Sequence, residues 1–364
     1  MELATKPDLP EVLARFEAWW NRQPLKRPLV TIEVEPDRPP QLPGKHHGSV
    51  RERWMDVEYV LDCVEARIEA GVYLGDTVPI YMPFLGPEIC AALFGAELVF
   101  KSEETSYSVP SVRRVRDLLA MEPDFSSPYW ETIRQLTDLS LQRGRGRWIT
   151  GVTDLHTNGD LLAAVRDPQQ LCLDCADDLE GVRLACEHVT DWFPAIFDDL
   201  YGRIAAAGQP CTTWTPGVAM APWYTISCDF ICMISPAMFG EAILPSLRRE
   251  IGHMKYSLFH LDGPGALKHL DALLELEELD AVQWVYGAGA GPAARWLDVY
   301  RRIQDAGKGL QIVGYGGLEE LRAVAPYLKP QGVWFWPIGR FCRTEAEAFL
   351  RWTSDWARSG DCSS

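Results

Sequence analysis

Along most of this chain, short apolar runs alternate with segments whose apolar residues recur at helical spacing. We predict strands at 148–153, 212–216, 224–230, 256–260, 281–285, 310–313 and 332–336. Helices are predicted at 129–142, 178–208, 236–253, 265–276, 292–306, 318–328 and 344–357. Strands that are apolar throughout are typical of a parallel sheet covered on both faces.

The first third of the chain is less regular. Helices are predicted at 10–23 and 50–70, and strands at 29–34 and 78–82. A proline-rich segment, Pro36 to Pro43, excludes a helix or a central strand there. The aromatic face of the first helix can pack on the rest of the chain or on a second subunit, so a homodimer is one expectation.

About eight helix–strand units in a chain of 364 residues predict an α/β fold, a (β/α)8 TIM barrel. We expect one domain over 1–364, with residues 1–75 as a helical and proline-rich N-terminal extension packed on the barrel. A doubly wound open sheet is the alternative. Against it, no G-x-G-x-x-G follows the first strand, and Gly287–Gly291 reads G-A-G-A-G, which has different spacing.

The amino-acid composition argues against some classes of binding partner. The net charge of −16 argues against binding to nucleic acid or to anionic membranes. No apolar run approaches the ~18 residues that span a bilayer. The ten cysteines are scattered and no signal peptide precedes them, which predicts a reduced, cytoplasmic protein. Cys172 and Cys175 are interpreted as ordinary helix cysteines.

The carboxyl ends of barrel strands carry the chemistry of such enzymes. His260 and Asp262 end one predicted strand, and residues i and i+2 of a strand point to the same side. The pair can supply two ligands to a divalent metal or form an acid–base pair. The alternative is that Asp262 caps the next helix and His260 is packed in the barrel.

Other strand ends add candidates. Asp154 and His156 repeat the i, i+2 spacing, and Cys228 with Asp229 can form a thiolate–carboxylate site, although buried cysteines are often inert. We predict His260, Asp262, His156 and Asp229 as catalytic residues, and His260, Asp262 and Cys228 as metal ligands. An aromatic rim suited to flat or apolar substrates is predicted from Trp214, Trp284, Tyr315, Trp334 and Trp336, together with Asp154.

These residues resemble the uroporphyrinogen decarboxylase superfamily, which also contains corrinoid methyltransferases. The resemblance spans nearly the whole chain and is carried mainly by Phe259–Gly265, Leu279–Trp284, Thr153–Asp160 and Cys228–Pro236. The segments Leu85–Pro87 and Phe16–Trp20 agree with it, the latter resembling an uncharacterised, decarboxylase-like branch. The resemblance also implies a (β/α)8 barrel.

Two departures bear on the reaction. The arginine-rich N-terminal segment that grips the carboxylates of porphyrinogens is missing before Pro36. The methyltransferases bind zinc through His-x-Cys and a distant cysteine, whereas here Asp262 stands at the first cysteine position. Oxygen and nitrogen ligands give a harder Lewis acid, suited to activating an O-methyl or N-methyl donor.

The resemblance therefore implies a methyltransferase or demethylase acting on a small O- or N-methyl compound. Zn²⁺ is its expected cofactor, no tightly bound organic cofactor is expected, and a separate corrinoid protein is the expected methyl acceptor. The alternative is a metal-free decarboxylase of a carboxylated aromatic or pyrrole, in which an aspartate stabilises a cationic intermediate. A barrel that only binds a ligand is the third possibility.

Overall fold

A six-stranded parallel sheet joins one strand from near the N-terminus to five strands that lie between Trp223 and Pro337. The computed structural model describes residues 1–287 and 289–361. The strands follow the order β1-β11-β10-β9-β8-β7, and each adjacent pair is parallel. Their bounds are β1 Leu29–Val30, β7 Trp223–Ser227, β8 Tyr256–Asp262, β9 Ala281–Val285, β10 Gly309–Gly314 and β11 Val333–Pro337. This confirms an α/β fold with a mostly parallel sheet.

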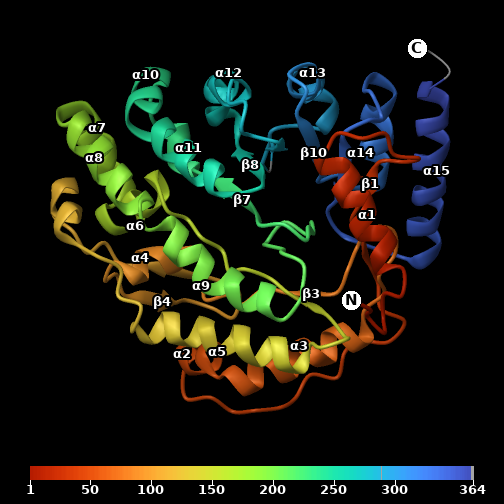
Figure 1. Ribbon diagram of the computed structural model, residues 1–364, viewed down its shortest axis with the longest axis horizontal. Coiled ribbons are helices and arrows are strands. Elements are labelled where there is room, and N and C mark those ends of the chain that lie inside the picture. Colours follow the sequence, from red (N-terminus) through yellow and green to blue (C-terminus); the bar gives the residue numbers. More distant parts are fainter. Residues whose placement is uncertain (288, 362–364) are drawn as a thin grey trace.

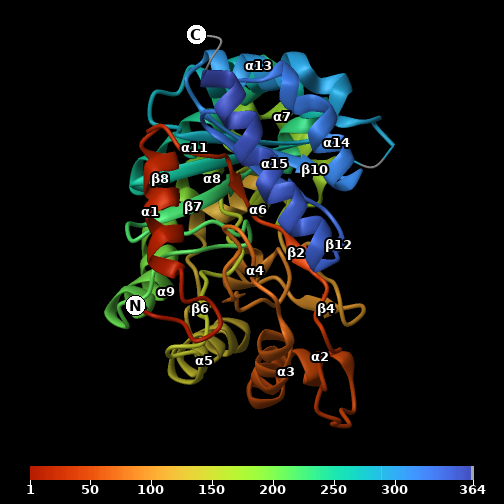
Figure 2. The same ribbon diagram turned by 90° about the vertical axis from the view of Figure 1, so that its right-hand side faces the viewer.

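Helices follow one another around the outside of the molecule (Figures 1 and 2). In the first half of the chain they are α1 Leu9–Trp20, α2 Val50–Met55, α3 Val57–Ala70, α4 Ile89–Leu93, α5 Pro128–Arg143, α6 Gly159–Arg166 and α7 Pro168–Asp177. In the second half they are α8 Leu179–Thr190, α9 Phe193–Ala206, α10 Pro236–Met238, α11 Leu244–His253, α12 Leu270–Leu274, α13 Leu297–Asp305, α14 Gly317–Val324 and α15 Arg343–Asp361.

Short ladders continue the architecture beyond the main sheet. Strand β3 (Ile80–Tyr81) pairs in parallel with β6 (Ile149–Thr150), β4 (Leu98–Phe100) pairs antiparallel with β5 (Ser106–Ser108), and β2 (Glu33–Val34) pairs with β12 (Arg340–Phe341). Beyond β6, the Val152 amide donates to the Thr212 carbonyl at 2.9 Å. Within the described ranges, these ladders do not close into a barrel.

Helix α1 packs on the sheet of its own chain. The Phe16 and Trp19 rings meet Trp334 edge-on at 5.2 and 5.5 Å, and Trp20 stacks on Tyr256 at 5.2 Å. All five rings belong to one hydrophobic core that extends from Leu3 to Phe349. The aromatic face of the first helix is therefore covered within the chain.

Several predicted elements differ in length. The predicted strand at 212–216 is irregular, with a single bridge between Cys211 and Ala219, because Pro216 lacks an amide proton and the Thr212 hydroxyl bonds the Gly217 carbonyl. The predicted strands at 78–82 and 148–153 shorten to two residues each.

Several predicted helices are divided. The predicted helix at 178–208 splits into α8 and α9, the second starting just before Pro194. The helix predicted at 50–70 divides at Asp56, whose carboxylate caps α3. A 3-10 turn, Pro264–His269, replaces the first half of the helix predicted at 265–276.

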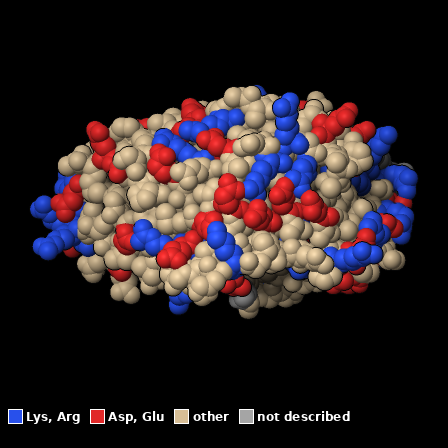
Figure 3. Space-filling model, turned by 90° about the horizontal axis from the view of Figure 1, so that it is seen from below, with Lys and Arg blue, Asp and Glu red and all other residues tan. Residues whose placement is uncertain are grey.

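Ion pairs join α3 to the last residue of α5 and to the turn that follows it, on the face seen from below in Figure 3, where acidic and basic side chains are interspersed. Arg143 contacts Glu58 and Asp62, and Arg147 contacts Glu65 and Glu69. In the part of the chain that the structure describes, every helix is too short or too polar to cross a bilayer.

Candidate functional site

The register of the central strands places a row of polar side chains on one face of the sheet. Ser227 lies opposite His260, His260 opposite Gln283, and Gln283 opposite Gln311. Asp262 is two residues beyond His260 and faces the same side. The pairing of parallel strands is therefore what brings the polar residues of four strands together.

Two glutamines orient His260. Gln283 donates through Nε2 to Gln311 Oε1 at 2.5 Å, so its Oε1 is left to accept from His260 Nδ1. His260 consequently carries its proton on Nδ1 and presents the lone pair of Nε2. Metal-binding histidines are commonly held in this way by a hydrogen bond to the other ring nitrogen.

Asp229 completes a group with His260 and Asp262. One ligand atom from each of the three residues lies within 4.8 Å of the others. Asp229 begins the 3-10 turn η2, Asp229–Met233, which directly follows the end of β7. Partial burial of its carboxyl group and the nearby Asp160 carboxylate raise the pKa of Asp229 to about 6. Within the described ranges, the carboxylates of Asp229 and Asp262 accept no hydrogen bond.

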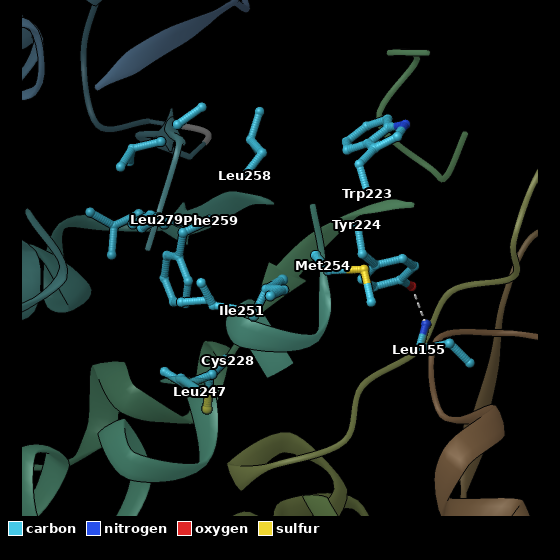
Figure 4. Close-up of a cluster of buried hydrophobic side chains, with 14 of the residues drawn as sticks. Leu155, Trp223, Tyr224, Cys228, Leu247, Ile251, Met254, Leu258, Phe259 and Leu279 are labelled. Carbon is cyan, nitrogen blue, oxygen red and sulfur yellow. Dashed lines mark hydrogen bonds between the residues drawn. The ribbon is translucent and has the colours of Figure 1, made fainter. Parts of the chain in front are cut away.

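Cys228 does not join this group, which corrects its prediction as a metal ligand. It follows Ser227 by one residue at the extended end of β7, so its side chain points away from the face that carries Ser227 and His260. A Cβ added to Gly159 of α6 would lie 2.9 Å from its sulfur, and Figure 4 shows Cys228 beside Leu247 in the apolar core. Burial raises the pKa of the Cys228 thiol well above its usual range, which keeps it protonated.

A second polar group surrounds His156. Its Nε2 lies 3.0 Å from Asp154 Oδ1 and its Nδ1 lies 3.0 Å from Asp160 Oδ2. Burial alone lowers the pKa of His156, but the two carboxylates reverse this effect and raise it well above its usual range. Asp160 also accepts the backbone amides of Asp229 and Phe230, at 3.0 and 2.9 Å, and so links the two groups.

Hydrogen bonds attach the loop that carries His156 to strand β7 and to helix α11. Asn158, at φ 94°, donates through Nδ2 to the Ser227 carbonyl at 3.1 Å and to Glu250 Oε2 at 2.9 Å. Burial raises the pKa of Glu250 to about 7. Figure 4 shows the Leu155 amide donating to the Tyr224 hydroxyl on β7.

Three of the predicted aromatic residues lie near the strand ends. The Trp214 ring meets the His260 ring edge-on at 4.9 Å. Trp214 and Trp336 line one cavity of about 520 Å³. Tyr315 is 44% exposed, and the nearby Asp262 carboxylate adds to the burial that raises its pKa.

Trp284 and Trp334 do not line the mouth, which corrects their predicted position. Both are fully buried. Trp284 follows Gln283 by one residue, so it lies on the other face of the sheet and packs against Trp296 at 5.3 Å. Trp334 packs against helix α1 and donates from Nε1 to the Thr31 hydroxyl at 2.9 Å.

The fold is similar to that of a methyltransferase from Methanosarcina mazei. The TM-score is 0.60 at 12% sequence identity, and the alignment covers 94% of this chain and 98% of that chain. At this identity the likeness shows the fold. No protein-family model matches the sequence, and no curated protein matches it.

Sequence reasoning left out four residues that shape the site. Gln283 and Gln311 are polar residues in the middle of buried strands, which is a signal available from the sequence. Asp160 lies in the first turn of α6, where an acidic residue is common, so the sequence gives no sign of its contact with His156. Glu250 gives no signal, because one acidic residue in a helix resembles any exposed residue.

Proposed function

We propose that this chain is a metal-dependent methyltransferase that removes a methyl group from a small O- or N-methyl compound. The observation that carries the proposal is the convergence of Asp229, His260 and Asp262. The likeness in fold to a methyltransferase supports it. A separate corrinoid protein is the proposed acceptor, by the resemblance to the corrinoid branch of the uroporphyrinogen decarboxylase superfamily.

The donor set fits a catalytic zinc ion. Two carboxylates and one imidazole supply three protein ligands, which leaves a position for substrate. The two carboxylates accept no hydrogen bond from the described residues, and His260 presents Nε2 because Gln283 holds its Nδ1. Bound zinc would act as a Lewis acid on the oxygen or nitrogen that carries the methyl group.

The residues around this group have supporting roles. Gln311 and Gln283 keep His260 in one tautomer and one orientation. His156, held as an imidazolium between Asp154 and Asp160, is a proton donor near Asp229. The indole of Trp214 meets the His260 ring edge-on and limits the space beside it.

We also infer that the fold is a (β/α)8 barrel whose remaining strands are short or irregular. The supporting bonds run from the Ile149 amide to the Pro79 carbonyl, from Gly151 to Tyr81 and from Val152 to Thr212, at 2.8–2.9 Å. In such a barrel the proposed metal ligands lie at the carboxyl ends of the strands, where barrel enzymes hold their active sites.

Metal content is the direct test. We expect about one zinc per chain by mass spectrometry after purification with zinc, and its loss in H260A and D262N. H253A is the matched control, because His253 is a partly exposed histidine that bonds Asp198 on the surface. Methyl transfer from methoxy- or N-methyl compounds to free cob(I)alamin, followed by its absorbance, then tests the reaction.

A wild-type protein that binds no zinc, or binds it equally in H260A, contradicts the metal site. The metal-free decarboxylase would then be favoured by one observation. With its pKa raised to about 6, Asp229 can exchange a proton close to neutral pH.

A further inference from the structure

A second cavity, of about 580 Å³, lies beside Asp229 and shares no lining residue with the one that Trp214 lines. Strand β5, helix α6 and the 3-10 turn η2 contribute to its wall. His156 and Asp229 both line it, so it connects the two polar groups of the candidate site. Its volume is within the range of small-molecule sites, and a ligand in it can contact a candidate metal ligand directly.

Most of the wall of this cavity is apolar. Helix α6 contributes Leu161 and Ala164, β5 contributes Tyr107, and η2 contributes Phe230 and Met233. Tyr107 is 47% exposed and Met233 is 48% exposed, although both are large and hydrophobic. An apolar ligand that covers such side chains gains about 25 cal/mol for each Å² removed from water. The wall therefore favours a ligand with a substantial apolar part.

The acidic side chains in the wall are paired within the protein, with one exception. The Glu88 carboxylate accepts a backbone amide of β5, and Asp167 accepts two backbone amides at the start of α7. Asp160 pairs with His156 and accepts two backbone amides of η2. The exception is Asp229, which the proposed function assigns to the metal. A cationic ligand would therefore have to compete with the metal for its only free carboxylate.

An anionic ligand finds no free cation either. Among the described residues, no lysine or arginine lines this cavity, and the His156 imidazolium is already held between two carboxylates. Lys268 lies outside the wall, where its Nζ donates to the Cys232 carbonyl at 2.9 Å. Because moving an unpaired charge out of water is costly, the cavity disfavours charged ligands of either sign.

From these observations we infer that the cavity binds an uncharged aromatic methyl ether. The Tyr107 and Phe230 rings and the apolar side chains of α6 cover the ring of the ligand, and its methoxy group lies next to Asp229. The inference rests on the proposed function for the reaction. It narrows the substrate from O- or N-methyl compounds to neutral methyl ethers, since alkyl amines are protonated at neutral pH.

Titration calorimetry on the full chain tests this with 4-methoxybenzyl alcohol as the probe. Two ligands of nearly the same shape serve for comparison, the anion 4-methoxybenzoate and the protonated cation of 4-methoxybenzylamine. We expect the alcohol to bind and both charged ligands to bind at least about tenfold more weakly.

One variant removes an apolar contact from the wall. Y107A is expected to weaken binding of 4-methoxybenzyl alcohol by about 5- to 10-fold, because a ring that covers the ligand is lost. Y327A is the matched control, since Tyr327 is also exposed and lies outside this cavity. It should bind the alcohol as the wild type does.

Another variant changes the charge of the wall. M233K places a cation in the cavity and should bind 4-methoxybenzoate at least about fivefold more tightly than the wild type does. M220K is its matched control, because Met220 is likewise exposed and does not line the cavity. The affinity of M220K for the carboxylate should equal that of the wild type.

The inference is overturned if the alcohol does not bind, if either charged ligand binds as tightly, if Y107A behaves like Y327A, or if M233K behaves like M220K. H260A separates it from the metal site, because His260 does not line the cavity. If the alcohol binds through Tyr107 to a chain that takes up no zinc, the ether site stands and the metal-dependent function fails. If zinc binds and the alcohol does not, the metal site stands and the ether site fails.

Discussion

Buried carboxyl groups near the candidate site titrate at unusual pH because the fold removes them from water. Glu250 is 2% exposed, and its hydrogen bonds from Thr157 and Asn158 do not offset the cost of burying its charge. Asp229 is more exposed, but the Asp160 carboxylate lies close to it. Both groups therefore hold protons at higher pH in the folded chain than in the unfolded chain.

Replacing Glu250 with glutamine should remove part of the pH dependence of stability. Between its usual pKa of 4.5 and its folded pKa of about 7, the folded state holds a proton that the unfolded state releases. The contribution of Glu250 therefore lowers the free energy of unfolding as pH rises through this window, by on the order of 3 kcal/mol. Urea denaturation at pH 5 and pH 8 should show a smaller decline in E250Q.

E241Q is the control for this measurement, since Glu241 is an exposed carboxylate just before the same helix. It should keep the wild-type decline. If the decline in E250Q also equals that of the wild type, the burial of a protonated Glu250 is contradicted.

Asp229 should make metal affinity depend on pH. A metal must displace the proton that this carboxyl group holds below pH 6, so its contribution to zinc affinity should fall by about tenfold per pH unit below that value. Calorimetric titration with Zn²⁺ between pH 5 and 7 should give weaker binding in D229N, with a slope shallower by one proton. Equal slopes would remove Asp229 from the ligand set.

Strand periodicity alone predicts which face of the sheet several of the candidate residues occupy. The spacing of His260 and Asp262 correctly places both on one face of β8. The same periodicity, applied to Gln283, places Trp284 on the opposite face, away from the mouth. Asp229 lies in the 3-10 turn after β7, so its approach to His260 depends on that turn and on the β7–β8 register, which are tertiary properties.

Among the elements, the N-terminal segment is held to the sheet by one buried carboxylate. Asp76 is fully buried and bonds Arg15 of α1 at 2.6 Å, Arg27 at 2.7 Å and the Val30 amide of β1 at 2.7 Å. Without Asp76, the Val30 amide would lose its acceptor, and the two arginines would keep only the Pro28 carbonyl. Breaking such a buried pair costs more than the pair itself contributes.

D76N should therefore destabilise the protein by about 3–5 kcal/mol. The measurement is the free energy of unfolding in urea at neutral pH. D37N is the matched control, because Asp37 forms a single ion pair with Arg343 at the surface and should cost less than about 1 kcal/mol. A D76N variant as stable as D37N would show that α1 and β1 are held by apolar packing alone.

The predicted elements match the structure where a run of residues is apolar and buried. They differ from it where side-chain hydrogen bonds compete with the strand ladder. Strand β9 was predicted with its observed bounds, because 281–285 is a buried apolar run. The segment 212–216 is richer in threonine, and its threonine hydroxyls bond Gly217 and Thr225 instead of supporting a ladder. The break between α8 and α9 follows from Pro194, a signal that the sequence shows.

At the scale of the molecule, one hydrophobic core connects the N-terminal segment to the last helix. It extends from Leu3 to Phe349, and the Trp19 and Trp20 rings of α1 are almost fully buried within it (Figure 2 shows α1 against the sheet). Helix α1 and strand β1 share this core with the sheet, whereas α3 packs against α5 in a second, smaller cluster. We therefore expect α1 and the sheet to unfold as one cooperative unit.

This predicts a single transition when unfolding is followed by tryptophan fluorescence and by far-ultraviolet circular dichroism, with coincident midpoints. W20A should lower the free energy of unfolding by about 3–5 kcal/mol and shift both midpoints together, because the cavity that it leaves lies in the shared core. W54A is the comparison, since the Trp54 ring is only partly buried beside Phe84 and Phe100. Two separate transitions, or a W20A variant that shifts only one probe, would mean that α1 and the sheet form independent units. In that case zinc binding should persist at urea concentrations at which α1 has already unfolded. If α1 and the sheet form one unit, zinc binding and the packing of α1 should be lost at the same urea concentration.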